Sequence, residues 1–238
     1  MSVVAIISTK GGAGKSTVAV HLAVAAAMKR RKPLIVDFDK KQLSVLIWGK
    51  GLRKRAKKPA IVKGDFESFT EDLDKARAKH DLIIIDVAAG GGDEVRDLAT
   101  IADHIIVPVR ASAFDMAATR NTIDLLRNSA DNTEPEEIAY RNSLGKAAIV
   151  LNCTPPRRTK KWENEVNEAL LSCGAGGLDI IGTLSDRDAF RTAIEHGHGV
   201  TEDKDDEIAV AEIQDLYAGL RALESKREKK LKQMRRRR

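Results

Sequence analysis

The residues best suited to chemistry lie together near the N-terminus, in the sequence STKGGAGKST at positions 8–17. Three of them are glycines, which lack a Cβ atom, so successive backbone N–H groups can converge on phosphate oxygens at the start of a helix. The Lys15 ammonium stands where it can reach β- and γ-phosphates, and the Ser16 hydroxyl stands where it can bind Mg²⁺. The segment therefore predicts a binding loop for a nucleoside triphosphate.

This loop differs from the usual pattern G-x-x-x-x-G-K-[ST] at its first position, where Thr9 replaces glycine and Lys10 follows directly. The resulting pattern is K-G-G-x-G-K-[ST]. A chance match to it is rare, because glycine averages only about 7% of residues. The alternative is a glycine-rich surface turn. The expected nucleotide-binding residues of the loop are Lys10, Gly11, Gly12, Ala13, Gly14, Lys15, Ser16 and Thr17.

The segments on either side of the loop are typical of a strand and a helix. Residues 3–7 form an apolar run rich in β-branched side chains, as expected of a buried strand, and residues 18–30 are rich in alanine, as expected of a helix. The peptide dipoles at the start of such a helix favour the negative charge of a phosphate. Strand, glycine loop and helix therefore follow in the order that a phosphate-binding loop requires.

Three aspartates stand at the ends of two further apolar runs. Asp86 follows the run at 82–85, and Asp37 and Asp39 leave the run at 33–36. A carboxylate at the C-terminal end of a buried strand lies beside the phosphate loop in a doubly wound sheet, so Asp86 can hold Mg²⁺ through water. Asp37 and Asp39 are two residues apart and point to the same side, and one of them must orient the attacking water. The alternative for each aspartate is a helix cap or a turn.

Lys10 has a mechanistic implication of its own. A lysine that precedes the loop cannot readily fold back onto the γ-phosphate that the same loop surrounds. It is better placed to act on a nucleotide held by a second subunit, where it would neutralise phosphate charge as an arginine finger does in trans. The alternative is an exposed lysine with no role in a partner subunit.

Together these motifs resemble the ParA/MinD family of deviant Walker ATPases, and within it the small ParA-type partition ATPases, over nearly the whole chain. The resemblance rests on the loop, on the D-x-D at 37–39 and on the strand that ends in Asp86 like a Walker B segment. Other similar segments are the glycine-rich switch at 89–92, the A-D-h-h-h-h-P strand at 102–108 and the R-x-A-F at 187–190. Gln42 is near the family's D-P-Q glutamine, but Lys40-Lys41 replace the proline and displace the glutamine by one position.

The resemblance implies a dimer in which two protomers sandwich two ATP molecules. It implies catalytic roles for Lys10, Lys15 and Asp39, with Lys10 crossing the interface and Asp39 orienting the attacking water. ATP would then be both the substrate and the ligand that joins the two chains. A weak basal ATP hydrolase is the expected enzyme.

The resemblance also implies the ligands of the metal and of the base. Ser16, Asp37 and Asp86 would hold Mg²⁺, and Asp37 would also support the glycine-rich switch at 89–92. Asn152 would contact adenine, although an asparagine before a Pro-Pro sequence also suits a turn.

Length and composition fit one α/β domain at 1–225, a doubly wound unit with a mostly parallel central sheet flanked by helices, followed by a basic C-terminal tail at 226–238. No apolar run reaches 18 residues and the first strand starts at residue 3, so we expect neither a membrane span nor a signal peptide, and a cytoplasmic protein. Cys153 and Cys173 are expected to be free thiols.

Strands are expected near 3–8, 33–37, 81–86, 104–109, 146–151 and 178–182, and helices at 14–30, 68–79, 93–102, 114–129, 159–173, 186–196 and 205–232.

Positive charge is concentrated near the C-terminus. Residues 226–238 contain nine basic residues and one acid, so this tail carries +8 and the rest of the chain −2. A second basic run at 50–58 contains no acid. Such clusters indicate a polyanion partner, and nonspecific DNA is the leading candidate, because phosphate contacts need no base readout. The alternative is a solvated helix face followed by a disordered tail.

A membrane surface, as in the MinD branch, is the rival polyanion. The last helical segment offers four aliphatic side chains and no aromatic residue after Tyr217, which makes a poor membrane anchor, so the sequence favours DNA. An aromatic content of 4% also argues against recognition of single-stranded nucleic acid by stacking.

The sequence therefore predicts a nucleoid-associated ParA-type ATPase that drives plasmid or chromosome partition. A small centromere-binding partner, similar to ParB or ParG, would stimulate hydrolysis. Alternatives are a MinD-like ATPase on a membrane and a ParA-like ATPase that positions another cargo such as carboxysomes. An iron–sulfur scaffold carrier on the same fold would need a C-x-x-C motif, whereas Cys153 and Cys173 are far apart.

Overall fold

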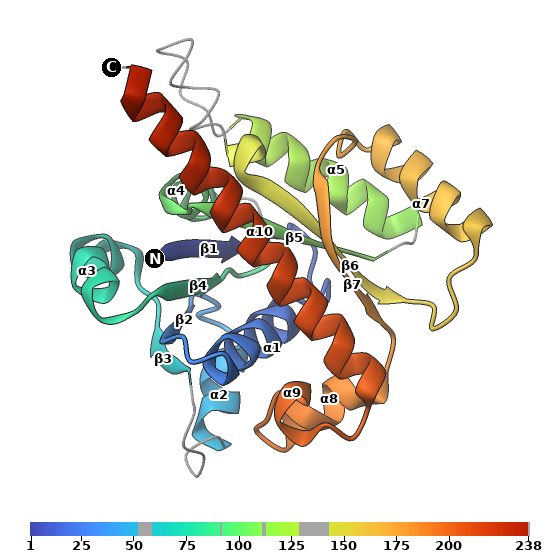
Figure 1. Ribbon diagram of the computed structural model, residues 1–238, viewed down its shortest axis with the longest axis horizontal. Coiled ribbons are helices and arrows are strands. Elements are labelled where there is room, and N and C mark those ends of the chain that lie inside the picture. The colour runs from blue at the N-terminus through green and yellow to red at the C-terminus, as the bar shows by residue number, and fades with distance from the viewer. Residues whose placement is uncertain (52–58, 91, 111–112, 129–142, 238) are drawn as a thin grey trace.

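Seven strands form one parallel sheet in the order β3-β2-β4-β1-β5-β6-β7 (Figure 1). This computed structural model describes residues 1–51, 59–90, 92–110, 113–128 and 143–237. Strands β4, β2 and β3 lie on one side of β1 and strands β5, β6 and β7 on the other, as in doubly wound folds, which confirms the predicted fold class. The strands are β1 (Ser2–Ile6), β2 (Pro33–Asp37), β3 (Ala60–Lys63), β4 (Leu82–Asp86), β5 (His104–Arg110), β6 (Ala147–Thr154) and β7 (Asp179–Ser185).

The central strands are apolar along their whole length because helices cover both faces of the sheet. Side chains alternate between the faces, so Val3 and Ile83 lie in one core and Val4 and Ile84 in the other. The register pairs Asp86 at the end of β4 with Asp37 at the end of β2. The carboxyl ends of these strands therefore meet at one edge of the sheet, which we call the carboxyl edge.

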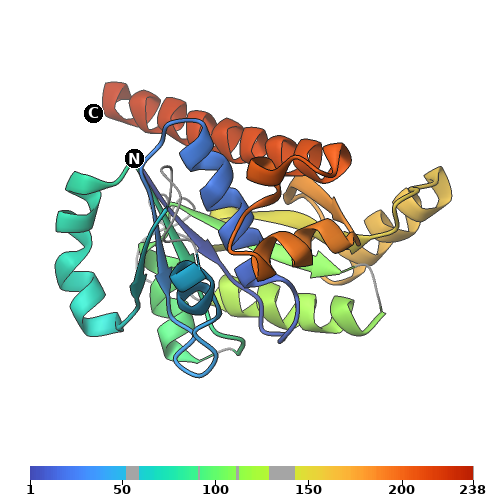
Figure 2. The same cartoon turned by 90° about the horizontal axis from the view of Figure 1, so that it is seen from below.

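Two helical layers enclose the sheet (Figure 2). One face is covered by α1 (Lys15–Met28), α2 (Ser44–Gly51), α8 (Asp188–Glu195), α9 (Val200–Asp203) and α10 (Glu207–Arg237). The other face is covered by α3 (Phe66–Lys79), α4 (Asp93–Ile101), α5 (Ala113–Asn128) and α7 (Lys160–Ser172). A short 3₁₀ helix, Ser143–Lys146, precedes β6.

The long helix α10 runs antiparallel to the strands. Near its start Glu212 accepts a hydrogen bond of 2.9 Å from the backbone N–H of Ser185 at the end of β7. Further along, Glu224 accepts a bond from Arg31, 3.0 Å from Nη1, and one from the hydroxyl of Ser2, the first residue of β1. Helix α10 thus crosses the whole sheet, and Gly219 allows its backbone close to β7, where a Cβ would lie 2.2 Å from the carbonyl oxygen of Ile181.

The predicted basic tail is part of this helix. Residues 226–237 continue α10 without a break, so the expected boundary after residue 225 falls inside one helix, which also runs five residues beyond the predicted end at 232. In Figure 1 this end of α10 projects away from the helices α8 and α9. The last three turns of α10 are therefore a helical, basic extension of the domain.

His21 on α1 is fully buried where α8 and α9 pack against it. Its Nε2 atom lies 3.2 Å from the carbonyl oxygen of Phe190, and its Nδ1 atom accepts a bond of 3.3 Å from the backbone N–H of Val200. These partners assign the neutral ring with the proton on Nε2. Burial lowers the pKa of His21 to about 4.

The six strands and seven helices expected from the sequence all have counterparts in the structure, whereas β3, α2 and α9 were not predicted. Of the second basic run, residues 52–58 lie outside the described residues. Cys153 and Cys173 are free thiols, as expected. None of the described helices is long and apolar enough to cross a membrane.

Candidate nucleotide-binding site

The phosphate loop joins β1 to α1 at the carboxyl edge of the sheet. Gly12 and Gly14 have φ angles of 75° and 94°, in the left-handed region that favours glycine. A Cβ on Gly14 would also lie 2.0 Å from the Nδ2 atom of Asn152. Position 14 therefore requires glycine both for its backbone angle and for space.

Side chains from both flanks hold the loop in place. Asn152 in β6 is buried, and its Nδ2 atom donates a bond of 2.9 Å to the carbonyl oxygen of Ala13. On the other flank, the hydroxyl of Thr9 donates to the carbonyl oxygen of Ala118 in α5, 3.0 Å away, and the backbone N–H of Thr9 donates to the hydroxyl of Thr122, 3.1 Å away. The two hydrogen bonds of Thr9 to α5 explain why threonine stands at the position of the usual glycine. Contact between Asn152 and adenine stays a prediction.

Ser16 and Asp86 come together as the sequence predicts. The Ser16 hydroxyl donates a bond of 2.6 Å to Oδ2 of Asp86, which is 1% exposed. The second carboxylate oxygen, Oδ1, is buried without a hydrogen-bond partner among the described residues. Burial raises the pKa of Asp86 to about 7. A buried carboxylate oxygen without a hydrogen-bond partner, beside a hydroxyl, is chemically suited to hold a cation.

Lys15 supplies a positive charge on the same side of the loop. Its ammonium is buried, and it donates a bond of 3.4 Å to the carbonyl oxygen of Lys10 inside the loop. Burial lowers the pKa of Lys15, while the negative charges of Asp86 and Asp39 oppose that shift. Lys15 is therefore held beside the carboxylates at the centre of the loop.

The donor set of this site fits Mg²⁺. The ion prefers hard oxygen ligands and keeps several waters and phosphate oxygens, so it needs only one or two protein groups. The unpartnered Oδ1 of Asp86 and the hydroxyl of Ser16 are such groups. Within the described part of the chain, no group of three His, Cys, Asp or Glu side chains could hold a metal by itself. A Mg²⁺ ion held here would complete its coordination with waters and phosphate oxygens.

The two aspartates that follow β2 have different environments. Asp37 is fully buried, and its Oδ2 atom accepts bonds of 3.1 Å from the backbone N–H groups of Val45 and Leu46 in the first turn of α2. Its Oδ1 atom accepts another from the N–H of Asp39. These contacts match the alternative interpretation of Asp37 as a helix cap, and its role toward Mg²⁺ stays a prediction. Burial raises the pKa of Asp37.

Asp39 is half-buried and closer to solvent. Its Oδ1 atom accepts bonds from the backbone N–H groups of Lys41 and Gln42, at 3.2 and 2.9 Å, which fix the turn after β2. Gln42 itself is exposed and contributes its backbone to this turn. The role of Asp39 in orienting water stays a prediction.

Lys10 forms an ion pair of 2.7 Å with Oδ1 of Asp115, in the first turn of α5. The Lys10 side chain is 35% exposed and that of Asp115 is 10% exposed. The ammonium is therefore held at the rim of its own phosphate loop by a neighbouring helix. Its role toward a second subunit stays a prediction.

The remaining predicted residues lie around this centre. Gly11 is exposed at the tip of the loop, and Thr17 is half-buried in the first turn of α1. In the glycine-rich switch, Gly90 has a φ of 134° and Gly92 caps the N-terminus of α4, while residue 91 lies outside the described residues. The switch thus links the end of β4 to α4 beside Asp86.

Comparison with known proteins identifies the family. Residues 4–200 match the model of the CobQ/CobB/MinD/ParA nucleotide binding domain. This match covers most of the chain, including the loop and every aspartate discussed above. The protein belongs to this family, in which MinD and ParA proteins are ATPases.

Two relatives align over most of their length. The chain is 26% identical over 201 residues to the maintenance of carboxysome distribution protein A of Halothiobacillus neapolitanus, covering 82% of this chain and 85% of that protein. It is 25% identical over 202 residues to the protein ParA of Rhizobium radiobacter, covering 83% and 84%. The family assignment agrees with the resemblance seen in the sequence.

Solved structures share the fold. A chain of the MinC:MinD cell division protein complex of Aquifex aeolicus superimposes with a TM-score of 0.68 at 18% identity, covering 93% of this chain and 96% of that one. The septum site-determining protein MinD of Pyrococcus horikoshii, complexed with Mg-ADP, gives a TM-score of 0.65 at 16% identity, covering 95% and 98%. At these identities the likeness supports the fold alone.

Sequence reasoning missed the residues that hold the loop from outside. Asp115 and Thr122 lie more than a hundred positions from their partners Lys10 and Thr9. Their signal in the sequence is weak, since an aspartate in a first helical turn is a common helix-stabilising choice. Only the packing of α5 against β5, the neighbour of β1 in the sheet, brings them to the loop.

Proposed function

We propose that this protein is a ParA-type ATPase that binds ATP with Mg²⁺, dimerises around the nucleotide and binds DNA without sequence preference. The observation that carries the proposal is the phosphate loop itself, with buried Lys15 beside the Ser16–Asp86 pair and with Lys10 at its rim. The fit of the site to a nucleotide and a hard cation supports ATP hydrolysis as the reaction.

Each residue has a role in this reaction. The backbone N–H groups of the loop and the Lys15 ammonium would bind the phosphates, and Ser16 and Asp86 would hold Mg²⁺, which neutralises charge on the β- and γ-phosphates. Asp39 would orient the attacking water with its carboxylate. Asp37 would keep Asp39 and α2 in position through the three backbone bonds that it accepts.

The position of Lys10 supports dimerisation. Its ammonium lies at the rim of the loop and is paired with Asp115, so in a dimer whose loops face each other it can reach the phosphates bound by the partner. Charge stabilisation in trans makes hydrolysis depend on both chains. ATP binding and dimerisation would then be coupled.

The basic end of α10 supports a polyanion partner, and DNA is the one we propose. A protein on the nucleoid in the cytoplasm would use such binding to move or separate a cargo. The relative named ParA favours plasmid or chromosome partition, with a small centromere-binding ParB- or ParG-like protein that stimulates hydrolysis. The relative named for carboxysome distribution favours carboxysomes as the alternative cargo. A MinD-like role on a membrane is the further alternative.

Light scattering and DNA titration test this function. We expect a monomer in ADP, a dimer in ATP with Mg²⁺, and tighter DNA binding in ATP, because two basic surfaces on one body give bivalent attachment. Fluorescence anisotropy on unrelated duplexes at several salt concentrations measures the binding. Log K should fall linearly with log salt, by about 0.9 per phosphate contacted. Equal DNA affinity in ATP and ADP would refute the ATP-gated function.

A further inference from the structure

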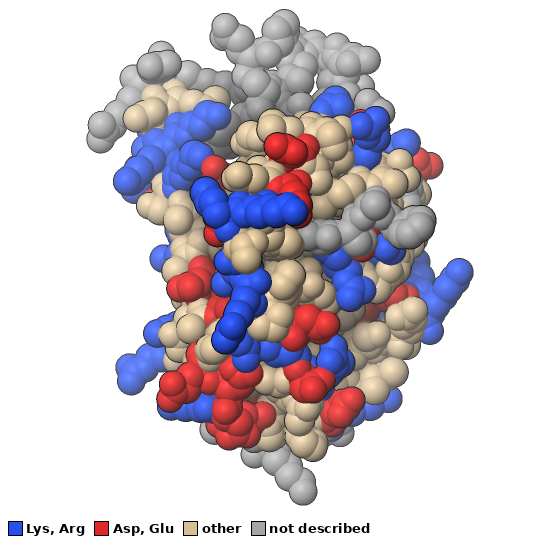
Figure 3. Space-filling model, turned by 90° about the vertical axis from the view of Figure 1, so that its right-hand side faces the viewer, with Lys and Arg blue, Asp and Glu red and all other residues tan. Residues whose placement is uncertain are grey.

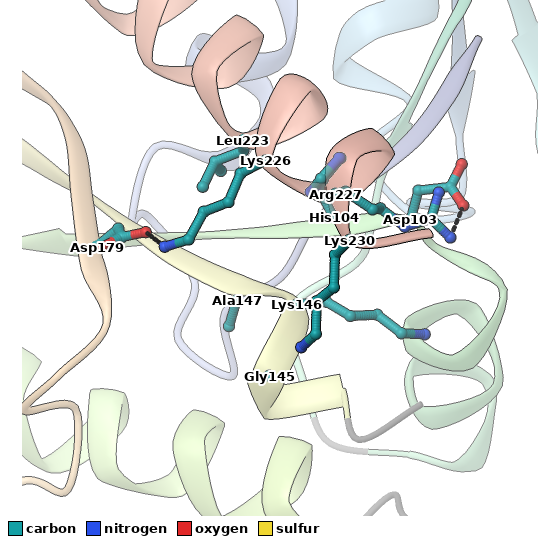
Figure 4. Close-up of a pocket in the computed structure, with 10 residues that line it drawn as sticks. All are labelled: Asp103, His104, Gly145, Lys146, Ala147, Asp179, Leu223, Lys226, Arg227 and Lys230. Carbon is teal, nitrogen blue, oxygen red and sulfur yellow. Dashed lines mark hydrogen bonds and ion pairs between the residues drawn. The ribbon is translucent and has the colours of Figure 1, made fainter. Parts of the chain in front are cut away.

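The two edge strands of the sheet differ in how they meet solvent. Figure 3 shows the side of the molecule on which α7 and β7 lie, where Lys, Arg, Asp and Glu are spread over the surface. At the start of β7, Asp179 pairs with Lys226 of α10, 3.0 Å away (Figure 4). At its end, the backbone N–H of Ser185 donates to Glu212 of the same helix. A covering helix and charged side chains protect this edge against pairing with another chain.

The opposite edge strand, β3, is less protected. It pairs with β2 alone in the described part of the chain, so no strand lies along the outer side of its backbone. Three of its four residues are exposed, and Val62 is 44% exposed. Its one charged residue is Lys63, at its end. The outer N–H and C=O groups of β3 are therefore available to a further strand.

A groove of about 390 Å³ lies between β3 and α3, and we call it the edge groove. Ile61 packs on the opposite side of the sheet, in the core that contains α1 and α2. Alternate residues of β3 therefore face the groove, as alternate residues of a strand laid beside it would. Apolar side chains from three elements line it: Leu34 and Val36 of β2, Ala60 and Val62 of β3, and Phe69 and Ala76 of α3.

Positive charges outnumber negative ones at the rim of the edge groove. Three lysines and two aspartates line it. Asp65 caps the N-terminus of α3, and Asp72 pairs with Lys75, 2.6 Å away. Lys63 ends β3, whereas Lys79 ends α3, which runs back along the strand toward the start of β4. The two ends of the groove therefore each carry an exposed lysine.

An aromatic contact joins the edge groove to the candidate nucleotide site. The ring of Phe69 meets the ring of Phe38 edge-on, with 5.5 Å between centroids and 82° between planes. Phe38 lies between Asp37 and Asp39 in the chain. Its backbone N–H also donates a bond of 2.9 Å to the carbonyl oxygen of Asp86. A side chain on the floor of the groove is thus one contact away from the three aspartates.

The turn that follows β3 makes a second connection. The backbone N–H of Gly64 donates a bond of 2.7 Å to the carbonyl oxygen of Asp37. A Cβ at Gly64 would lie 2.5 Å from the ring of Phe38, so the turn and the ring are closely packed. A strand bound beside β3 would therefore act on the turn that carries Asp37 and Asp39.

We propose that the edge groove binds an extended, acidic segment of a partner protein, which adds a strand beside β3, and that this binding is coupled to the nucleotide. Main-chain bonds to β3 give affinity, and apolar side chains facing the groove give specificity. Acidic residues at the two ends of the segment meet Lys63 and Lys79. A second copy of this chain would instead bring its own lysines to the same rim. The coupling rests on the proposed function, in which a partner stimulates hydrolysis, whereas binding in the groove does not.

The probe is a fluorescent, end-blocked peptide with two glutamates at each end of a core in which three valines alternate with two threonines. At about 3.3 Å per residue, the core is long enough to cover β3. A second peptide has lysines in place of the glutamates. Two further peptides carry N-methyl groups on the backbone nitrogens of the valines or of the threonines, which removes the N–H donors from one side of the strand at a time.

Fluorescence anisotropy measures peptide binding to the full-length, nucleotide-free protein. Val62→Glu places a negative charge in the groove, and Ile180→Glu is the matched control on β7, because these side chains are 44% and 42% exposed. We expect the affinity for the acidic peptide to fall by at least about tenfold in Val62→Glu and to stay unchanged in Ile180→Glu. Lys63→Glu/Lys79→Glu should bind the acidic peptide about tenfold more weakly and gain binding of the lysine peptide.

Only one of the two methylated peptides should fail to bind, because β3 pairs with one side of the added strand. With Mg²⁺ and a nonhydrolysable ATP analogue, the affinity for the acidic peptide should change by at least about fivefold. Equal effects of Val62→Glu and Ile180→Glu, or no gain of the lysine peptide, would overturn the groove as the binding surface. Binding of both methylated peptides, or of neither, would overturn strand addition.

The nucleotide comparison decides the coupling separately. Equal peptide affinity with and without the ATP analogue would overturn it and leave the groove in place. A protein that binds the acidic peptide but does not hydrolyse ATP would refute the proposed function alone, because the peptide titrations use nucleotide-free protein.

Discussion

Lys10 and Asp115 are 105 positions apart in the sequence and form a 2.7 Å ion pair at the rim of the phosphate loop. The pair fixes a long side chain before any partner arrives. Ordering such a side chain in an interface costs about 0.5–1.5 kcal/mol of free energy in lost rotamer freedom. Because the ion pair with Asp115 already restricts the Lys10 side chain, less of this freedom is left to lose when a dimer forms. The pair therefore prepares Lys10 for the contact that we propose in the dimer.

Asp115→Asn keeps the shape of Asp115 and removes its charge. We expect the ATP-dependent dimer to weaken by about two- to twelvefold, the fold-change that corresponds to the ordering cost above. Sedimentation across a range of protein concentrations in ATP measures it, and ATP binding by the monomer serves as the control. A tighter dimer would mean that the pair restrains Lys10 instead of preparing it.

Lys15→Ala should abolish ATP binding and, with it, dimerisation, because the buried ammonium is the charge that contacts phosphates in the ground state. Titration calorimetry measures the affinity. Lys10→Ala is the matched control, since it removes a lysine from the same loop and should leave capture of ATP by the monomer largely intact. Near wild-type affinity in Lys15→Ala would show that the loop does not bind the nucleotide as assigned.

Asp39→Ala should separate binding from hydrolysis. The change removes the carboxylate that orients water and leaves Lys15, Ser16 and Asp86 in place, so ATP should persist and the dimer should become long-lived. Size-exclusion chromatography with light scattering in ATP and Mg²⁺ detects it. A strictly monomeric Asp39→Ala protein with normal ATP affinity would contradict dimerisation around ATP.

His21 makes stability depend on pH. Its folded pKa of about 4 is below the unfolded value of 6.5, so between these values the unfolded chain binds the proton and the folded chain does not. Stability from this residue is present above pH 6.5 and is lost as pH falls toward 4. The loss amounts to about 3 kcal/mol, at roughly 1.4 kcal/mol per pKa unit.

Thermal unfolding between pH 4.5 and 7.5 measures this effect in wild type and in His21→Gln. Glutamine can keep a donor and an acceptor and does not titrate. We expect the difference in melting temperature between the two proteins to change with pH across this window, in the direction that favours wild type at higher pH. A constant difference would show that His21 does not remain neutral in the fold.

Local sequence was sufficient for the elements that carry the site. The glycine loop, the apolar run before Asp86 and the alanine-rich α1 each have a pattern that fixes their structure within a few residues. Strand β3 was missed because its apolar run, from Ala60 to Val62, is too short to predict a strand by itself, and its side chains are mostly exposed at the edge of the sheet. Helix α2 was missed because its start depends on a cap from Asp37, which belongs to another element.

Tertiary packing decided what the sequence left open. The sequence predicted a helix to residue 232 and left a disordered basic tail as the alternative, whereas in the structure the helix continues to Arg237 and the ion pairs of Lys226 and Arg227 with distant aspartates hold its last turns. The position of Asn152 likewise depends on how close β6 comes to the loop. These relationships connect residues far apart in the chain, and no local pattern encodes them.

The most direct measurement of the proposed mechanism mixes two inactive variants, Lys10→Ala and Asp39→Ala. In a mixed dimer, one site combines Asp39 of its own chain with Lys10 of the partner, and the other site lacks both groups. We expect ATP turnover in the mixture to rise above that of either variant alone, because only the mixed dimer contains a complete site. Turnover in the mixture no higher than the average of the two variants, or a Lys10→Ala protein as active as wild type, would contradict the action of Lys10 across the interface.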